Sequence, residues 1–328
     1  MRFPEAIRRL LPLLCVMVLC GRLSSDWLVS SVPTTNDVIS LSMHGDMIAW
    51  AESDYSIYYW DGSSTHKVNG MTGDYVVCHN GQIAARSNYF FWDMIQFWNG
   101  NSVTNVKIMS TTDAAQFDLY NGAILYYEPG DATLCRWKNG NTTVLRTGIA
   151  GCNSVALYES TYAWRYGTVY FFDGAQTRPA SGGYGANLDL YDGQIVSNRY
   201  WKDDISGESG YALDFWQKTG WRTIDNDNST ASVCEGCVAY AKRDGTVRND
   251  YEIYFWDGST VTQVTDNQVD DTYPCLYINS PAQIAWITGG GEGICLAVQV
   301  VPEPGACLLL AFGLAAAGYG RRRRITGG

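Results

Sequence analysis

Histidine is scarce in this 328-residue chain, which contains three, and no two of them stand at the spacing of a metal site. A Gly-x-Ser-x-Gly nucleophile elbow and the sialidase Asp-box pattern are also missing. These absences disfavour the common hydrolytic mechanisms. Basic residues are fewer than acidic ones, 23 against 33, for a net charge of −10. A phosphate backbone would be repelled, so nucleic acid is not an expected partner, whereas cations or neutral sugars suit the chain better.

Apolar runs long enough for a permanent transmembrane helix, roughly 20 residues, are also absent. The two uncharged stretches near the ends of the chain are shorter than that. The first follows Arg2, Arg8 and Arg9, runs from Leu10 to Cys20 and ends at Gly21. A basic segment, a short apolar run and small residues in this order are typical of a secretory signal peptide. Residues 1–21 are therefore predicted to form a signal helix.

The second apolar stretch, residues 305–320, follows Val301-Pro302-Glu303-Pro304 and precedes four arginines. Prolines interrupt regular structure at its entrance, and the arginines resist translocation. Residues 301–328 resemble the PEP-CTERM sorting signal, which has a Pro-Glu-Pro motif, a short transmembrane helix and a basic cluster. The motif residues are Pro302, Glu303, Pro304, Arg321, Arg322, Arg323 and Arg324. The resemblance implies processing by an exosortase in a Gram-negative envelope, cleavage near Pro302–Pro304, transient anchoring in the inner membrane and delivery to the cell surface or exopolysaccharide. A plain C-terminal membrane anchor is the alternative.

Aromatic residues are abundant, with 22 Tyr and 12 Trp, a composition that favours β-strands. The stretch "IYYWDGSS" returns as "IQFWNGNS" and "IYFWDGST", and six aromatic residues recur at intervals of 35 to 44 residues. These residues are Trp60, Trp98, Trp137, Phe172, Trp216 and Trp256. A period near 40 indicates a repeat architecture.

Each repeat contains two turn signals, such as Asn80-Gly81 and Asp61-Gly62, which supply the positive φ angles of tight hairpins. Two hairpins per repeat predict a four-stranded antiparallel sheet, the blade of an all-β propeller. We expect seven blades in residues 22–300, with six or eight as alternatives. Residues 271–300 supply three strands of the last blade, and Asp26–Val32 supplies its outer strand. The repeated aromatic residues are then expected to pack between blades.

Residues 252–286 resemble TolB-type, WD-repeat-like propeller repeats. The shared features are a Trp-Asp-Gly turn, a Thr-Asp-Asn step, an Asp-Asp pair, a proline and an Ile-Ala-Trp strand. The match is close in this repeat and partial elsewhere. The resemblance implies a propeller scaffold and carries no function, because propellers of this type serve binding, transport and hydrolysis alike.

The hairpin turns of a propeller gather on one face and the more variable loops on the other. His44, His66 and His79 are expected on or near the turn side. Aromatic, acidic and amide residues in the loops suit sugar recognition, with solvated loops as the alternative. The candidate ligand-binding residues are Tyr89, Trp92, Asp93, Tyr200, Trp201, Asp203, Asp204, Arg248 and Asp250.

Catalytic residues are not assigned. The pairs Asp203-Asp204 and Asp270-Asp271 could in principle act as acid and base, but adjacent aspartates are more typical of turns. No cofactor is expected, although calcium is conceivable at Asp225, Asp227 and Ser229, which alternate in "DNDNST". That loop has neither the glycine nor the glutamate of a calcium-binding loop, so a turn is favoured.

Seven cysteines lie in the body, so an odd number leaves at least one thiol free even if others form disulfides in an exported protein. Cys234 and Cys237 flank a predicted turn, where a local disulfide or two buried thiols are both open.

These features predict an exported, surface-located or exopolysaccharide-associated propeller that acts as a non-catalytic binding or scaffold protein. The expected partners are the exosortase and an extracellular polysaccharide or surface protein. The alternative is a secreted polysaccharide-active hydrolase or lyase that uses loop carboxylates.

Overall fold

The computed structural model describes residues 27–300, except 90–91, 110–115, 183–186, 203–208, 218–219, 227, 244 and 246–249. The predicted signal helix and C-terminal transmembrane helix lie outside the described residues. No helix within the described part of the chain is long and apolar enough to cross a membrane.

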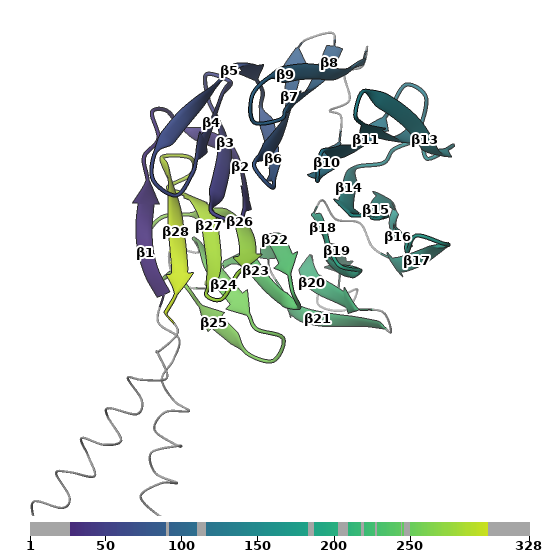
Figure 1. The fold of residues 1–328 in the computed structure, drawn as a ribbon. Helices are drawn as coiled ribbons and strands as arrows, with labels where there is room; N and C mark the ends of the chain where they lie inside the picture. The colour runs from purple at the N-terminus through teal and green to yellow at the C-terminus, as the bar shows by residue number, and fades with distance from the viewer. Residues whose placement is uncertain are drawn as a thin grey trace, which may run out of the picture. The chain divides into compact units, whose positions relative to one another are not determined.

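Seven four-stranded antiparallel sheets form the body, which confirms the predicted seven-bladed propeller (Figure 1). Blade 1 contains β2 (Val38–His44), β3 (Met47–Glu52), β4 (Ser56–Trp60) and β5 (Thr65–Thr72), and blade 2 contains β6 (Tyr75–His79), β7 (Gln82–Tyr89), β8 (Trp92–Trp98) and β9 (Val103–Met109). Blade 3 contains β10 (Phe117–Tyr120), β11 (Ala123–Glu128), β12 (Thr133–Lys138) and β13 (Asn141–Thr147), and blade 4 contains β14 (Ser154–Tyr158), β15 (Thr161–Tyr166), β16 (Thr168–Phe172) and β17 (Thr177–Gly182). Blade 5 contains β18 (Leu188–Tyr191), β19 (Gln194–Lys202), β20 (Ser209–Gln217) and β21 (Gly220–Asn226), and blade 6 contains β22 (Asn228–Cys234), β23 (Cys237–Arg243), β24 (Tyr251–Trp256) and β25 (Val261–Gln263).

Blade 7 is built from both ends of the body. Its strand order is β1 (Trp27–Val32), β28 (Gly293–Gln299), β27 (Ala282–Thr288) and β26 (Asp271–Ile278). The N-terminal strand therefore pairs with the last strand of the body, and the Ser30 hydroxyl donates to the Leu296 carbonyl at 3.4 Å. This confirms the predicted closure. Figure 1 shows β1 beside β28 at the outer edge of the blade.

The two sets of hairpin turns differ. Between the first and second strands of several blades, two residues with positive φ form the turn, as with Asn80 (50°) and Gly81 (74°). Between the third and fourth strands, the expected two-residue turn is wrong for Asp61, Asn99, Asp173 and Asp257, which lie outside the positive-φ region. There the side chain of the first turn residue accepts hydrogen bonds from the backbone: Asp61 Oδ1 accepts from the N–H groups of Ser63 and Ser64 at 2.9 and 2.8 Å. The side chain thus substitutes for the missing left-handed residue.

The hydrophobic core lies between neighbouring blades. One cluster joins Phe215 and Leu213 of blade 5 to Val233, Tyr240 and Trp256 of blade 6. At several junctions, the residue before the repeated aromatic packs on the aromatic ring of the next blade, with centroids 5.3 Å apart for Phe97–Trp137 and Phe171–Trp216, and 5.1 Å for Phe215–Trp256. The expectation that the repeated aromatics pack between blades is confirmed.

We predict that Phe215→Ala lowers the free energy of unfolding by about 3–5 kcal/mol, because it empties a closed site between two blades. Tyr59→Ala, at the equivalent position of blade 1, is expected to cost clearly less because Tyr59 is half-buried. Urea denaturation of both variants tests this comparison. If both variants lost the same free energy of unfolding, closed junctions would not contribute more to the core than the more exposed junction of blade 1.

Candidate functional site

The propeller presents two faces with different chemistry. The loop face comprises the connections at residues 53–55, 73–74, 129–132, 148–153, 167, 264–270 and 289–292, with the strand ends beside them. The turn face comprises the turns at residues 45–46, 61–64, 80–81, 99–102, 121–122, 139–140, 159–160, 173–176, 192–193, 235–236, 257–260 and 279–281.

Exposed aromatic side chains gather on the loop face. Among the described side chains, the exposed aromatics are six tyrosines with exposed fractions of 41% to 54%. They are Tyr55, Tyr75, Tyr166, Tyr200, Tyr211 and Tyr273. All six belong to loop-face connections or to the strand ends beside them. The loop face therefore offers phenol rings to solvent.

The hairpin β19–β20 carries a pair of these tyrosines. Both strands have nine residues and are longer than the other described strands. Tyr200 and Tyr211 face each other across the hairpin, with ring centroids 5.6 Å apart in an edge-to-face arrangement. Trp201, the next residue, is half-buried, and its indole N–H has no hydrogen-bond partner.

Two of the exposed tyrosines adopt a backbone conformation that tyrosine rarely takes. Tyr55 has φ 64° and Tyr273 has φ 54°. Backbone hydrogen bonds hold Tyr55: its N–H donates to Glu52 at 2.8 Å, and its carbonyl accepts from Gly73 at 2.9 Å. The Tyr273 N–H donates to the Thr230 hydroxyl at 3.1 Å. Such strained positions cluster at functional surfaces.

The predicted ligand-binding residues divide between surface and interior. Tyr200 is exposed, and Trp92 and Trp201 are half-buried. Asp93 is 0% exposed and Asp250 is 9% exposed, so neither carboxylate is on the surface. The backbone of Tyr89 lies in β7. Asp203, Asp204 and Arg248 lie outside the described residues. Sequence reasoning missed Tyr55 and Tyr273, although each stands in a connection between predicted strands.

Buried carboxylates anchor the connections beneath the loop face. Glu52 accepts from the Thr35 N–H at 3.0 Å and from the indole of Trp50 at 3.1 Å; burial raises the pKa of Glu52, but its hydrogen bonds outweigh burial and lower it overall. Glu252 accepts from the Asn267 N–H at 2.8 Å, and burial raises its pKa. These acids stabilise the connections through hydrogen bonds.

The residues considered for calcium binding form other contacts. Asp225 accepts from the Tyr240 hydroxyl at 2.9 Å and forms an ion pair with Lys242 at 2.7 Å. The Ser229 hydroxyl contacts that of Thr230, and Asp227 lies outside the described residues. Within the described ranges, no group of three or more His, Cys, Asp or Glu side chains is arranged to hold a metal ion.

The seven body cysteines are free thiols. Cys234 and Cys237 are opposite each other across their turn, where the possible local disulfide is not formed. Burial raises the pKa of Cys78 to about 11 and that of Cys234 to about 12. Thiols with such pKa values are poor nucleophiles at neutral pH.

A ring of side chains surrounds the channel where the inner strands reach the turn face. This collar consists of His44, His79, Tyr120, Tyr158, Tyr191, Cys234 and Tyr277. Ring centroids are 3.8 Å apart for His44–His79 and 5.0 Å apart for His44–Tyr277. The two histidines thus lie on the turn face, as predicted.

Both collar histidines are neutral at pH 7. Nδ1 of His44 accepts from the Asn80 N–H at 3.1 Å, and Nδ1 of His79 accepts from the Asn121 N–H at 3.2 Å. Their single proton therefore sits on Nε2. Burial lowers the pKa of His44, and burial together with the charge of His44 lowers the pKa of His79 to about 3.

Two aspartates line the channel and tie adjacent blades together. Asp118 accepts from the Leu157 N–H at 2.6 Å, and Asp189 accepts from the Val233 N–H at 2.8 Å. Burial raises the pKa of Asp118 to about 7 and also raises that of Asp189. The charge of Asp189 is a further, smaller cause at Asp118.

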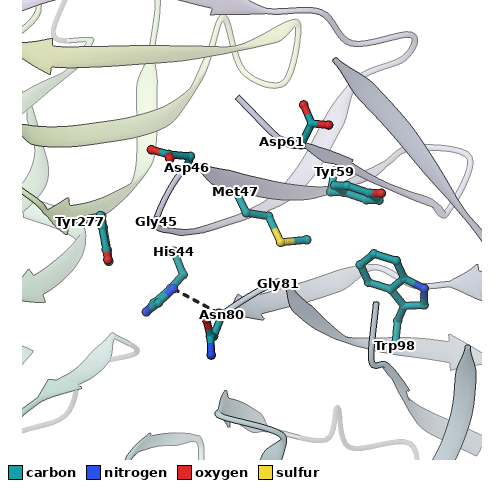
Figure 2. A pocket seen from close by; sticks show the side chains of 10 residues that line it. All are labelled: His44, Gly45, Asp46, Met47, Tyr59, Asp61, Asn80, Gly81, Trp98 and Tyr277. Carbon is teal, nitrogen blue, oxygen red and sulfur yellow. Dashed lines mark hydrogen bonds between the residues drawn. The ribbon is translucent and has the colours of Figure 1, made fainter. Parts of the chain in front are cut away.

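A pocket of about 390 Å³ opens on the turn face between blades 1 and 2, next to Tyr277 of blade 7. Figure 2 shows the side chain of Met47 across its middle, with Tyr59 and Trp98 on one side and His44 and Tyr277 on the other. Gly45, Asp46, Asp61, Asn80 and Gly81 complete the lining. The turn face, expected to be constant from blade to blade, is thus hollowed at one junction.

Comparison with known proteins identifies the sorting signal and the fold. Residues 300–324 match the PEP-CTERM protein-sorting motif. The match confirms the resemblance of the C-terminal segment, and the motif implies export, processing by an exosortase and a location at the cell surface or envelope. No curated protein sequence matches the chain.

Solved structures share the propeller. The β-propeller domain of the Trilobed protease from Pyrococcus furiosus is 8% identical, with a TM-score of 0.58 over 82% of this chain and 94% of that chain. YCF48 from Cyanidioschyzon merolae is 10% identical, with a TM-score of 0.54 over 84% and 99%. Pyrococcus horikoshii acylaminoacyl peptidase is 13% identical, with a TM-score of 0.55 over 77% of this chain and 51% of that chain. At these identities the likeness shows the fold alone.

The raised pKa of Asp118 predicts a pH-dependent stability. The unfolded chain has the ordinary value of 3.8, whereas the folded protein holds the proton up to about pH 7. Stability is therefore lost as pH rises through this window, because the folded state must ionise a buried acid. Asp118→Asn removes this ionisation, so the variant should not lose stability in this way. Between pH 4 and pH 8, its free energy of unfolding should therefore rise by about 1–3 kcal/mol relative to that of the unchanged protein.

Denaturation of both proteins across that pH range is the measurement. Asparagine keeps one of the two acceptor oxygens, so the loss of one hydrogen bond, from the Leu119 or the Leu157 N–H, adds a cost that does not vary with pH. A constant difference between the two proteins would contradict the raised pKa.

Proposed function

We propose that the chain is an exosortase-processed surface protein whose propeller binds neutral extracellular polysaccharide through its loop face, without catalysis. The observation that carries this proposal is the confinement of the exposed aromatic side chains, within the described part of the chain, to that face. A phenol ring can stack on the apolar face of a sugar ring and keep its hydroxyl for hydrogen bonds.

Charge supports a neutral ligand. The chain has a net charge of −10, so anionic polymers would be repelled. On the loop face, Glu52, Asp93 and Glu252 are buried. The exposed carboxylates of Asp54 and Asp270 each accept a backbone hydrogen bond at 2.9 Å, from Ser56 and from Tyr251. A binding role therefore fits better than hydrolysis or elimination by loop carboxylates.

Processing of the sorting signal is the first prediction. We expect the mature protein to lack the apolar segment 305–320 and the four arginines after it, because exosortase cleavage near Pro302–Pro304 removes them. Intact-mass measurement of the protein from the envelope of an expressing host tests this. Substitution of Pro302, Glu303 and Pro304 by alanine should leave the full tail attached, so that the protein from the envelope has the mass of the uncleaved form. Loss of the tail from this variant would contradict the proposal.

Polysaccharide binding is the second prediction. On an array of neutral glycans, the double variant Tyr200→Ala/Tyr211→Ala should bind at least about tenfold more weakly, since two stacking rings are lost. The matched control is Ile108→Ala/Val144→Ala, which removes two exposed apolar side chains from the outer strands β9 and β13.

Equal binding by the two double variants would remove the loop-face site. Shortened oligosaccharides released from the array would instead favour the hydrolase or lyase. A captured protein without any glycan signal would favour an interaction platform.

A further inference from the structure

The pocket on the turn face lies at a blade junction whose aromatic pair is less buried than the pairs of two sister junctions. At the junctions of blades 2–3 and 5–6, both members of the aromatic pair are buried: Phe97 with Trp137, and Phe215 with Trp256, all at most 7% exposed. At the junction of blades 1 and 2, the equivalent pair is Tyr59 and Trp98, with centroids 5.0 Å apart, and both rings are half-buried.

The first residue of the second strand differs between these blades. The second strand begins with Gln194 in blade 5, whose Oε1 accepts from the Gly236 N–H of the next blade at 2.7 Å. In blade 2 it begins with Gln82, whose amide lies beside Gly122 of the next blade but whose Oε1 has no hydrogen-bond partner. In blade 1 the equivalent residue is Met47, whose thioether cannot form this bridge to the turn of Gly81.

The lining of the open junction combines aromatic faces with negative charge. Tyr59, Trp98 and Tyr277 supply rings, and Met47 supplies a polarizable thioether. Asp46 and Asp61 supply carboxylates, and no lysine or arginine belongs to the lining. His44 is neutral, since its Nδ1 accepts a hydrogen bond from the backbone of Asn80.

Asp61 keeps its charge at neutral pH. Its Oδ1 accepts from the Ser63 hydroxyl at 2.7 Å, and its Oδ2 contacts Nε2 of His66 at 2.9 Å. Hydrogen bonds from Ser63, Ser64 and His66 lower the pKa of Asp61. His66 also stacks on Tyr59, with ring centroids 4.9 Å apart, and is not itself part of the lining.

We propose that this pocket binds an alkylammonium group, such as a methylated or quaternary amine. The negative faces of aromatic rings attract a weakly hydrated cation, and ionised carboxylates at the rim add to that attraction. A volume of about 390 Å³ accommodates such a group with a short carbon chain. A neutral molecule of the same shape gains only the apolar contacts.

The experiment uses the full chain and two probes that differ only in charge. Ligand-observed NMR titration with choline should show saturable binding. Its uncharged carbon isostere, 3,3-dimethylbutan-1-ol, should bind about tenfold more weakly. Equal affinities would overturn the ammonium assignment, and failure of choline to saturate would overturn the site.

Two substitutions test the location. Met47→Gln should restore the bridge seen in blade 5 and reduce choline binding at least about tenfold, with the fold checked by its thermal transition. Asp61→Asn should weaken choline about three- to tenfold and leave the isostere unchanged. The turn tolerates this change because Asn99 Oδ1 makes the same bonds in blade 2, at 3.0 and 2.9 Å.

Asp257→Asn is the matched control, since Asp257 holds the same turn in blade 6 and lies outside the pocket lining. Its choline affinity should be unchanged. If Met47→Gln binds choline as the unchanged protein does, or if Asp257→Asn weakens it as much as Asp61→Asn, the pocket is not the site. Tyr200→Ala/Tyr211→Ala should bind choline normally, so failure of the loop-face proposal leaves this one intact.

Discussion

Contact between neighbouring blades is the constraint on which the rest of this structure depends. Each four-stranded sheet is too small to bury its own apolar side chains, so the core forms where one sheet meets the next. The same aromatic pair recurs at several junctions, and inner-strand side chains such as Ser42 and Asp118 bond the backbone of the following blade. Pairing of β1 with β28 then joins the two ends of the body.

Because the same type of junction repeats around the ring, a different residue at one junction changes the surface there and leaves the other junctions unaffected. Gln194 bonds the next turn in blade 5, whereas Met47 stands at the same position in blade 1 and lines the pocket together with the aromatic pair Tyr59 and Trp98. Stability is distributed over many junctions, so a single open one costs little of the total. Recognition can therefore arise on the turn face as well as among the loops.

The blade number and its closure were predictable because they are written in local patterns. Turn dipeptides and a period near 40 define the blades, and the missing outer strand after residue 300 points back to Asp26–Val32. The first turns also follow their dipeptides, as Asn80-Gly81 shows. The same reasoning failed for Asp61-Gly62, because a side chain that bonds its own backbone is an alternative to positive φ that composition does not distinguish.

The candidate sites were less predictable, since burial depends on contacts between repeats. Asp93 and Asp250 stand among polar loop residues in the sequence, yet both are enclosed by the folded blades. Tyr200 was expected in a loop, but it lies in strand β19, where it is nevertheless exposed. The collar of His44, His79 and their neighbours required the ring itself, because residues about 40 positions apart meet only when the blades close.

The two faces of the propeller differ in their electrostatics. The turn-face pocket presents carboxylates, and the net charge of the whole chain is also negative. Both would attract the proposed cation, and salt would weaken that attraction by screening the charges. The loop face presents exposed phenol rings, so the proposed contacts with a neutral sugar would depend on shape and apolar area. Salt therefore separates the two modes of recognition: it should weaken contacts at the pocket and leave those at the loop face nearly unchanged.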